Sequence, residues 1–458
     1  MEKQIEAQKF QQIAGANRPE IRPLAELHVS RTAKGGINMK RVQCMVILLF
    51  LSCIIIGSVV NAQGKRHEPI TNQLINMVEH NADIKAMLVE SINKAREINP
   101  DKTTNPAQTL DEYYDFIDWA SKAMPWAILP TSTYSTLYEQ TYQALTYFYF
   151  INDQPLSQLE NKGYYNNSLQ YHEPYRTWLV NFIKQYGTFL STSKSWSNQI
   201  YRKVLNDDSF GLKKGWYEAP SNWKSFNDFF SRRLKSPDMR PISSPKNPSV
   251  VVSPADSQAQ GAWSIDGNSY LRQKDGVVIK SARLTSITKL IGKDSAYKDA
   301  FAGGTFTHAY LDVNDYHRCH FPVDGTVKEI RIIKGDVSIG GFVTWNAKSK
   351  KYLYDASELG WQAIQTRGCV IVETEDFGLV AILLIGDAQT SSVVFEDGVK
   401  PGNTFKKGDM LGYFLFGGSN AVMIFQKHVD FRLTVPSDGN GSYKHLLVGE
   451  EYGKLSKK

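Results

Sequence analysis

The chain has 458 residues, a formal net charge of +7, 42% hydrophobic residues and 22% charged residues. This composition can bury at least one large core, and it excludes an intrinsically disordered protein, a collagen and a coiled coil. The four cysteines are too few for a disulfide scaffold of this length. The charge is modest and spread along the chain, so nucleic acid is not an expected partner, whereas peripheral contact with anionic lipid is compatible with it.

The N-terminal part of the chain has the pattern of an export signal. Residues 1–38 are polar and without periodicity, and we interpret them as a mis-called extension ahead of Met39. Residues 39–62 give basic residues, an apolar run and a small-residue cleavage pattern, which is typical of a secretory signal peptide. The apolar run of about 19 residues is also long enough for a signal anchor. Either interpretation predicts that the chain after residue 62 is exported.

Residues 66–235 are predicted to form a helical domain, because apolar side chains recur along them at helical spacing. The aromatic stripes within this region are interpreted as core rather than as a ligand site. The stretches with this spacing are residues 70–78, 84–92, 110–120, 134–151 and 178–190.

A proline-rich stretch, residues 236–248, predicts a linker and a domain boundary. Beyond it, residues 249–458 carry short β-type runs separated by glycine-bearing turns, which predict a β-rich sandwich or barrel. The expected strands are residues 250–253, 305–313, 326–333, 369–373, 379–385, 411–416 and 421–425. The predicted fold class is therefore α+β, with a helical N-terminal region followed by a β-rich catalytic domain.

Three short motifs beside these β-type runs carry side chains that could do chemistry. Asp256 follows the first run, where it could orient a histidine or stabilise a turn. His317 and His320 are three residues apart, where they could act as acid and base, bind zinc, or be solvated. Ser419 follows paired glycines, so it could be a nucleophile beside an unhindered carbonyl or belong to a hairpin turn.

Together these motifs supply an acid, two bases and a nucleophile within one predicted domain, which is the inventory of nucleophilic catalysis with an oriented base. The Gly-X-Ser-X-Gly turn of the α/β-hydrolases is absent, so that route to serine chemistry is not supported.

The three motifs and their order resemble the phosphatidylserine decarboxylase family of pyruvoyl enzymes, over about residues 215–435. The helical region looks more like the extension of the soluble amino-acid decarboxylase branch, of which the fungal tryptophan decarboxylases are an example. The stretches that carry the family resemblance are Tyr316-His-Arg-Cys-His320, Gly418-Ser419, residues 226–235 and Arg240-Pro241.

The resemblance implies a role for each candidate residue. Asp256 would orient His320, and His320 would take the proton from the hydroxyl of Ser419. His317 would act in the decarboxylation half of the cycle, by protonating the carbanion left when carbon dioxide departs.

The resemblance also implies that the chain is a zymogen. The oxygen of Ser419 would attack the carbonyl carbon of Gly418, and the chain would cut itself between these residues. Residue 419 would then become a pyruvoyl group, a self-derived cofactor that serves as an electron sink, and no metal is expected. The small chain 419–458 would stay with the large chain ending at Gly418 by packing alone, because the last cysteine is Cys369.

Two departures from the family pattern bear on the substrate. Gly417-Gly418-Ser419-Asn420 stands where the family has Leu-Gly-Ser-Thr, and Ser257 stands where glycine is common. The family implies decarboxylation of phosphatidylserine to phosphatidylethanolamine. The helical extension and Asn420 favour the alternative of a free L-amino acid, with an aromatic one such as tryptophan as the example.

Two further functions stay open at this point. One is a zinc hydrolase that uses His317, His320 and His308. The other is a non-catalytic binding module, because residues 323–327 and 400–409 resemble the half-repeats of lipoyl-like barrels.

Overall fold

The computed structural model describes residues 66–129, 132–271, 286–355, 360–389, 392–437 and 442–458. Within it, His67–Lys458 forms one compact unit. The expected signal segment, residues 39–62, lies outside the described residues. A search of the described ranges for a helix long and apolar enough to cross a membrane finds none.

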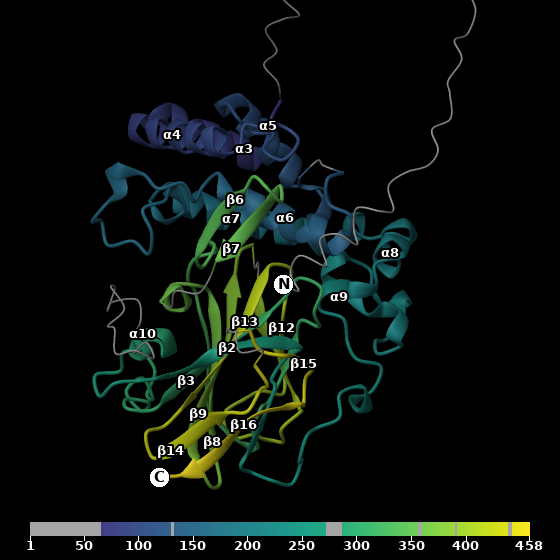
Figure 1. Ribbon diagram of the computed structural model, residues 1–458, viewed down its shortest axis with the longest axis vertical. Coiled ribbons are helices and arrows are strands. Elements are labelled where there is room, and N and C mark those ends of the chain that lie inside the picture. The colour runs from purple at the N-terminus through teal and green to yellow at the C-terminus, as the bar shows by residue number, and fades with distance from the viewer. Residues whose placement is uncertain (1–65, 130–131, 272–285, 356–359, 390–391, 438–441) are drawn as a thin grey trace, which may run out of the picture. The chain divides into compact units, whose positions relative to one another are not determined.

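The first part of the unit is helical, as the sequence predicts (Figure 1). Local side chains begin several of these helices: Asn81 accepts a hydrogen bond from the backbone of Ile84, and Ser225 forms a reciprocal cap with Asp228. The helices are α3 (Pro69–His80), α4 (Ala82–Ile98), α5 (Leu110–Ala120), α6 (Leu137–Phe150), α7 (Tyr175–Leu190), α8 (Asn198–Leu205) and α9 (Phe226–Phe230), with α10 (Ile287–Ile291) later in the chain.

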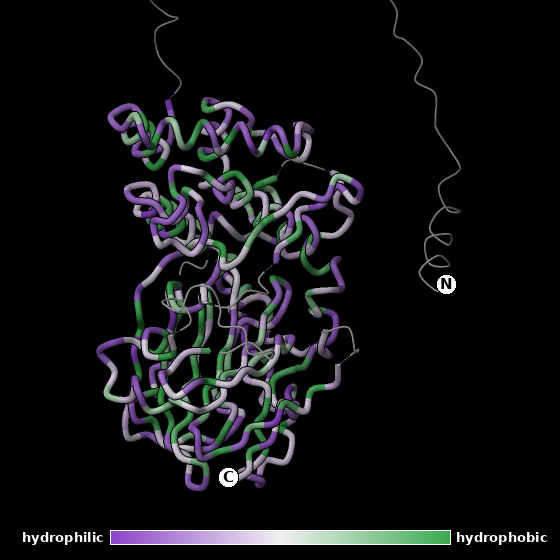
Figure 2. The backbone as a smooth tube through the Cα atoms, turned by 60° about the vertical axis from the view of Figure 1, so that its left-hand side comes forward, coloured by the Kyte–Doolittle hydropathy of each residue, from purple (hydrophilic) through white to green (hydrophobic). Residues whose placement is uncertain are grey.

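The second part of the unit is β-rich, which confirms the predicted α+β class. Its strands are β1 (Val250–Val252), β2 (Ser257–Ser264), β3 (Thr305–Leu311), β4 (Arg318–His320), β5 (Gly325–Ile333), β6 (Phe342–Asn346), β7 (Lys351–Asp355), β8 (Arg367–Thr374), β9 (Gly378–Asp387), β10 (Val393–Phe395), β11 (Thr404–Phe405), β12 (Met410–Phe414), β13 (Gly418–Phe425), β14 (Val429–Leu433), β15 (His445–Leu446) and β16 (Glu451–Lys457). Figure 2 shows hydrophobic residues gathered along these strands.

The main sheet has eight strands in the order β11-β5-β8-β9-β13-β3-β2-β15, and its neighbouring strands are antiparallel. Because side chains alternate along a strand, the two faces of the sheet pack on two different groups of buried residues. Ala421 and Met423 of β13 belong to the larger group, and Val422 and Ile424 belong to the smaller one. The sheet is therefore covered on both faces around β13.

The predicted linker contains one short 3-10 helix, Pro237–Met239, and the segments on both sides of residues 236–248 belong to the same compact unit. The hairpin formed by β6 and β7 was not predicted from the sequence, and it packs on α6 (Figure 1). The side chain of Gln143 on α6 donates a hydrogen bond to the carbonyl of Tyr352 on β7 at 2.9 Å and accepts another from the backbone amide of Tyr352. This contact joins the helical and β-rich parts.

We predict that Tyr352→Phe lowers the free energy of unfolding by about 1–3 kcal/mol, because buried polar partners lose their hydrogen bonds. The Tyr352 hydroxyl is fully buried, accepts from Asn99 at 2.8 Å and donates to the carbonyl of Thr104 at 2.7 Å. Chemical denaturation measures the change. The matched control is Leu353→Ala at the exposed neighbouring position, for which we expect a change within about 0.5 kcal/mol. Equal stability of Tyr352→Phe and the parent would contradict this assignment.

Candidate active site

Ser419 lies inside strand β13, near the centre of the eight-stranded sheet. Its backbone is opposite Gly386 on β9 and Leu311 on β3, and the residue is fully buried. Its hydroxyl donates a hydrogen bond to the carbonyl of Gly417 at 3.3 Å, so it is turned back toward the preceding peptides. The Gly-Gly-Ser-Asn motif therefore enters the sheet rather than forming a hairpin turn.

Asp387 lies close to the position before the serine, so a side chain at that position would be crowded. Gly418 is the register partner of Asp387, and a Cβ added at Gly418 would approach the Cβ of Asp387 to 3.1 Å. Gly417 adopts φ +144°, a conformation that residues with side chains rarely take. The paired glycines thus allow the chain to pass close to a neighbouring strand just before Ser419.

Asp387 was not identified by the sequence analysis. Its carboxylate accepts hydrogen bonds from Tyr354 at 2.7 Å and from the backbone of Gly340 at 2.8 Å. Burial raises the pKa of Asp387 to about 6, and its hydrogen bonds oppose that rise. A signal was present, because Asp387 is a lone acid at the end of the otherwise apolar run 378–387.

The backbone after Asp387 is strained next to the motif. Ala388 and Gln389 have φ of +25° and +64°, and such conformations cost about 1–3 kcal/mol each. The carbonyl of Ala388 accepts from the backbone amide of Gly418 at 2.8 Å. The hydroxyl of Tyr149, on α6, accepts from the backbone amide of Gln389 at 2.7 Å. A helix thus supports the strained loop that contacts Gly418.

His317 is a fully buried histidine beside the chain that leads into the motif. Its ring stacks on Phe230 with 3.8 Å between ring centroids, and Phe230 also contacts Phe416 at 5.3 Å. Neither ring nitrogen has a hydrogen-bond partner in the described part of the chain. Burial, and secondly the charge of Arg232, lowers the pKa of His317 to about 3. His317 is therefore neutral at ordinary pH, and the backbone of Asp312 and Val313 lies beside its ring without a hydrogen bond of good geometry.

His320 lies farther from the motif along the same pair of strands. It is the register partner of Met410 on β12, whereas the carbonyl of His317 accepts from the backbone of Phe414. Nδ1 of His320 contacts the carbonyl oxygen of Gly408 at 2.7 Å, so Nδ1 carries the proton and Nε2 faces the hydroxyl of Tyr316 at 3.2 Å. Burial lowers the pKa of this ring.

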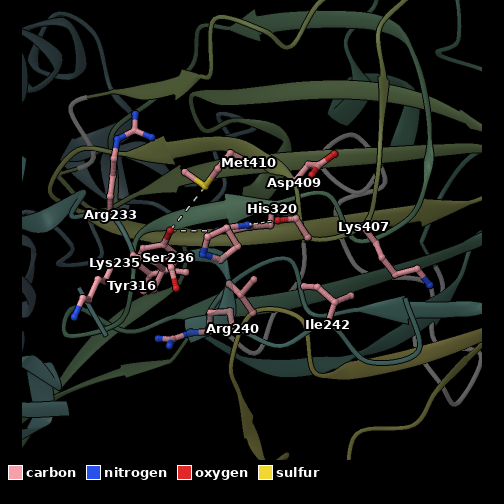
Figure 3. Close-up of a pocket in the computed structure, with 14 residues that line it drawn as sticks. Arg233, Lys235, Ser236, Arg240, Ile242, Tyr316, His320, Lys407, Asp409 and Met410 are labelled. Carbon is pink, nitrogen blue, oxygen red and sulfur yellow. Dashed lines mark hydrogen bonds between the residues drawn. The ribbon is translucent and has the colours of Figure 1, made fainter. Parts of the chain in front are cut away.

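His320 borders a cavity of about 410 Å³ (Figure 3). Figure 3 shows the ring beside Tyr316 and Met410, with Arg240 and Ile242 on another side. The cavity residues include cationic and apolar side chains, but Ser419 is not among them. This cavity therefore gives access to His320 rather than to the serine.

Asp256 contacts Arg240 rather than His320. The guanidinium donates to both carboxylate oxygens, at 2.9 and 2.6 Å, and the backbone amide of Val448 donates at 2.8 Å. Both ring nitrogens of His320 are engaged elsewhere, so the expected Asp256–His320 hydrogen bond is not formed in this structure. The physical reason is that a buried carboxylate without a charge partner is costly, and the guanidinium of Arg240 satisfies both of its oxygens. The negative charge of Asp256 still acts on His320 electrostatically.

The histidines of the zinc alternative do not converge. His308 contacts Asn420, with 2.8 Å between its Nε2 and the amide oxygen, and burial lowers its pKa to about 4. Asn420 and His308 lie on the sheet face opposite to that of Ser419, because neighbouring residues of β13 point to opposite faces. The ring of His317 packs on Phe230, and the ring of His320 contacts Tyr316 and Gly408. The three histidine rings therefore do not share a site.

Comparison with known proteins assigns the β-rich part to a family. Residues 226–454 match the family model described as Phosphatidylserine decarboxylase. The phosphatidylserine decarboxylase proenzyme of Saccharophagus degradans is 30% identical, and the alignment covers 54% of this chain and 84% of that protein. The corresponding proenzyme of Fusobacterium nucleatum is 32% identical over 52% of this chain and 72% of its own length. Proenzyme 2 of Oryza sativa is 34% identical over 51% of this chain and 34% of its own length.

We predict that His317→Phe makes the stability less dependent on pH, tested in a Ser419→Ala background in which an intact chain is expected. His317 has a pKa of about 3 when folded and 6.5 as its ordinary value, so unfolding takes up one proton between these limits. That uptake lowers the free energy of unfolding by about 1.4 kcal/mol for each unit of falling pH. Phenylalanine keeps the stack on Phe230 and removes the titrating ring.

The measurement is denaturant unfolding of both proteins between pH 6 and pH 4, since this interval lies between the folded pKa of about 3 and the ordinary pKa of 6.5. As the pH falls, the free energy of unfolding of the parent should decrease more steeply than that of the variant. The difference in slope should correspond to the uptake of about one proton on unfolding. Parallel curves would show that the ring of His317 is not a buried neutral base.

Proposed function

Because the chain belongs to the phosphatidylserine decarboxylase family, we propose that this decarboxylase acts on the serine head group of phosphatidylserine and releases phosphatidylethanolamine and carbon dioxide. The observation that carries the proposal is the buried Gly418-Ser419 peptide within the segment that matches the family. The names of the relatives, which call them proenzymes, agree with a chain that must be processed.

We propose that the processing step is self-cleavage at this peptide. The hydroxyl of Ser419 loses its proton to a base, and its oxygen takes the acyl group of Gly418 from the backbone nitrogen. Loss of the α-proton of residue 419 then breaks the new ester bond, which frees the carboxylate of Gly418. Water then hydrolyses the remaining carbon–nitrogen bond of residue 419, and the nitrogen leaves as ammonia. The product is a pyruvoyl group at residue 419, which supplies an electron sink for decarboxylation.

The surroundings of Ser419 support this chemistry. Gly418 places no side chain in front of the attacked carbonyl, and the hydroxyl is already turned toward the preceding peptides. Burial excludes water from the peptide, which favours attack by the serine over attack by solvent. Neutral His317 and His320 can each accept and return a proton, and which of them serves the serine stays a prediction.

Strand pairing supports retention of the small chain after cleavage. The segment from residue 419 onward contributes β13, which pairs with both β3 and β9. It also contributes β15, which pairs with β2, and β16, which pairs with β1. These ladders hold the segment without a covalent link, since Cys319 and Cys369 are free thiols before residue 419.

We predict that the purified protein consists of two chains divided between residues 418 and 419. Denaturing mass spectrometry should find a fragment of residues 419–458 whose N-terminus is blocked and reacts with hydrazine. Ser419→Ala should remain one chain, because it lacks the attacking oxygen. An active protein that is a single intact chain with a free serine would overturn the mechanism.

Three matched variants separate the roles of the acid and the two bases in the same experiment. Asp256→Asn and His320→Ala should leave the precursor uncut if these residues serve the cleavage. His317→Ala should still cut but turn over about 10²–10⁴-fold more slowly, the usual loss for a proton-transfer residue. A cut His320→Ala protein and an uncut His317→Ala protein would exchange the two assignments.

We predict that the processed enzyme releases carbon dioxide from phosphatidylserine in mixed micelles. Tryptophan, tyrosine and phenylalanine are the comparison substrates, and the Ser419→Ala protein is the blank. A kcat/KM for the lipid at least ten times that for each amino acid is the expected result. Release from an aromatic amino acid without release from the lipid would replace the lipid by the free amino acid as substrate.

A further inference from the structure

A second cavity, of about 400 Å³, lies next to the residue that follows the cleavage site. Its lining includes Asn420 and His308 from the central strands β13 and β3, and four tyrosines from three elements. The tyrosines are Tyr138 and Tyr142 on α6, Tyr310 on β3 and Tyr354 on β7. We call this cavity the tyrosine cleft. Helix α6 lies outside the segment that matches the family, so the helical region supplies part of its wall.

One side of the tyrosine cleft offers an unused hydrogen-bond donor. Asn420 is 1% exposed, and its amide oxygen is 2.8 Å from Nε2 of His308. Because the amide oxygen of Asn420 accepts at that distance, Nε2 of His308 carries the proton. This contact orients the amide so that its nitrogen, Nδ2, points away from His308. Nδ2 has no hydrogen-bond partner among the described residues. A buried donor without a partner is costly, and a bound carboxylate or other oxygen acceptor would satisfy it.

The other side of the tyrosine cleft favours a cation. The hydroxyl of Tyr138 donates to a carboxylate oxygen of Asp312 at 2.6 Å, and the other oxygen accepts from the backbone of Val313 at 2.8 Å. These contacts fix the carboxylate at the rim of the cleft, where Asp312 belongs to the lining. Aromatic faces with a nearby carboxylate are the usual surroundings of a bound ammonium group.

We propose that the tyrosine cleft binds the α-amino-acid head group of the substrate. The carboxylate accepts from Nδ2 of Asn420, and the ammonium group lies among the tyrosine rings on the side of Asp312. The proposal rests on the proposed function, because residue 419 is bonded to Asn420 and becomes a chain end after cleavage. Cleavage removes the bond from residue 419 to the preceding chain, so the reactive end of residue 419 can turn about its remaining bond toward the cleft while β13 stays paired with β3 and β9.

The size of the cleft limits what it holds. A volume of about 400 Å³ suits a small ligand and not the two acyl chains of a phospholipid, which remain outside. The same α-amino-acid group is present in phosphatidylserine and in a free amino acid. The experiment therefore uses a soluble probe for each source: glycerophosphoserine for the lipid head group and L-tryptophan for the free amino acid.

The test measures binding by calorimetry to the uncut Ser419→Ala chain, which cannot react with either probe. Glycerophosphoserine should bind at least ten times more tightly than glycerophosphoethanolamine, which lacks the carboxylate. Asn420→Leu should remove that preference. Asp312→Asn should weaken the binding of glycerophosphoserine and of glycerophosphoethanolamine about tenfold, because both carry the ammonium group. Leu353→Ala, at an exposed position on β7 next to Tyr354, is the matched control and should bind as the parent does. Thermal melting shows that each variant is folded.

The outcomes separate the cleft from the proposed function. Equal binding of the two glycerophosphoryl probes, or binding unchanged by both cleft variants, overturns the role of the cleft even if the wild-type enzyme decarboxylates phosphatidylserine. Binding of L-tryptophan alone supports the cleft and contradicts the lipid substrate. Binding of glycerophosphoserine that is lost in the variants, together with a wild-type enzyme that fails to turn over the lipid, retains the cleft and overturns the proposed function.

Discussion

The pairing of β13 on both of its edges is the constraint on which the rest of the structure depends. Its first residue, Gly418, pairs with β9, Ser419 lies between β9 and β3, and both ladders continue without a break to Phe425. This pairing fixes the backbone of the peptide that we expect to cleave, buries it from water, and leaves the small chain attached afterwards. It also favours glycine at position 418, because a Cβ there would approach Asp387 on β9 to 3.1 Å.

Burial determines the electrostatics around this strand. His308 and His317 have lowered pKa values because a charged ring is poorly solvated there, so both are neutral at ordinary pH. Asp256 keeps its charge partner in Arg240, which the sequence analysis had placed in a family signature without a role. The ring of His317 is the neutral base that stacks on the aromatic residues leading into the motif. A proton transferred from Ser419 to a neutral histidine leaves two neighbouring buried charges of opposite sign rather than one isolated charge.

The helical region belongs to the same machinery as the sheet. Helix α6 carries Tyr149, which supports the strained loop beside Gly418, and Tyr138 and Tyr142, which line the tyrosine cleft. The hairpin of β6 and β7 joins this helix to the sheet. Its Tyr354 lines the tyrosine cleft and donates a hydrogen bond to Asp387. A segment outside the family match thus shapes the surroundings of the chemistry proposed for residues 418 and 419.

The sequence by itself determined the α+β class, the approximate strands and helices, and the order Asp256, His317, His320 and Ser419, because periodicity and short motifs are local properties of the chain. Only the tertiary structure decided which partners these groups have. It paired Asp256 with Arg240, set Asp387 against Gly418, and joined Asn420 to His308. Periodicity reports that a side chain is buried but not which distant segment covers it, and contacts between residues far apart in the chain form only when the strands pair in one register.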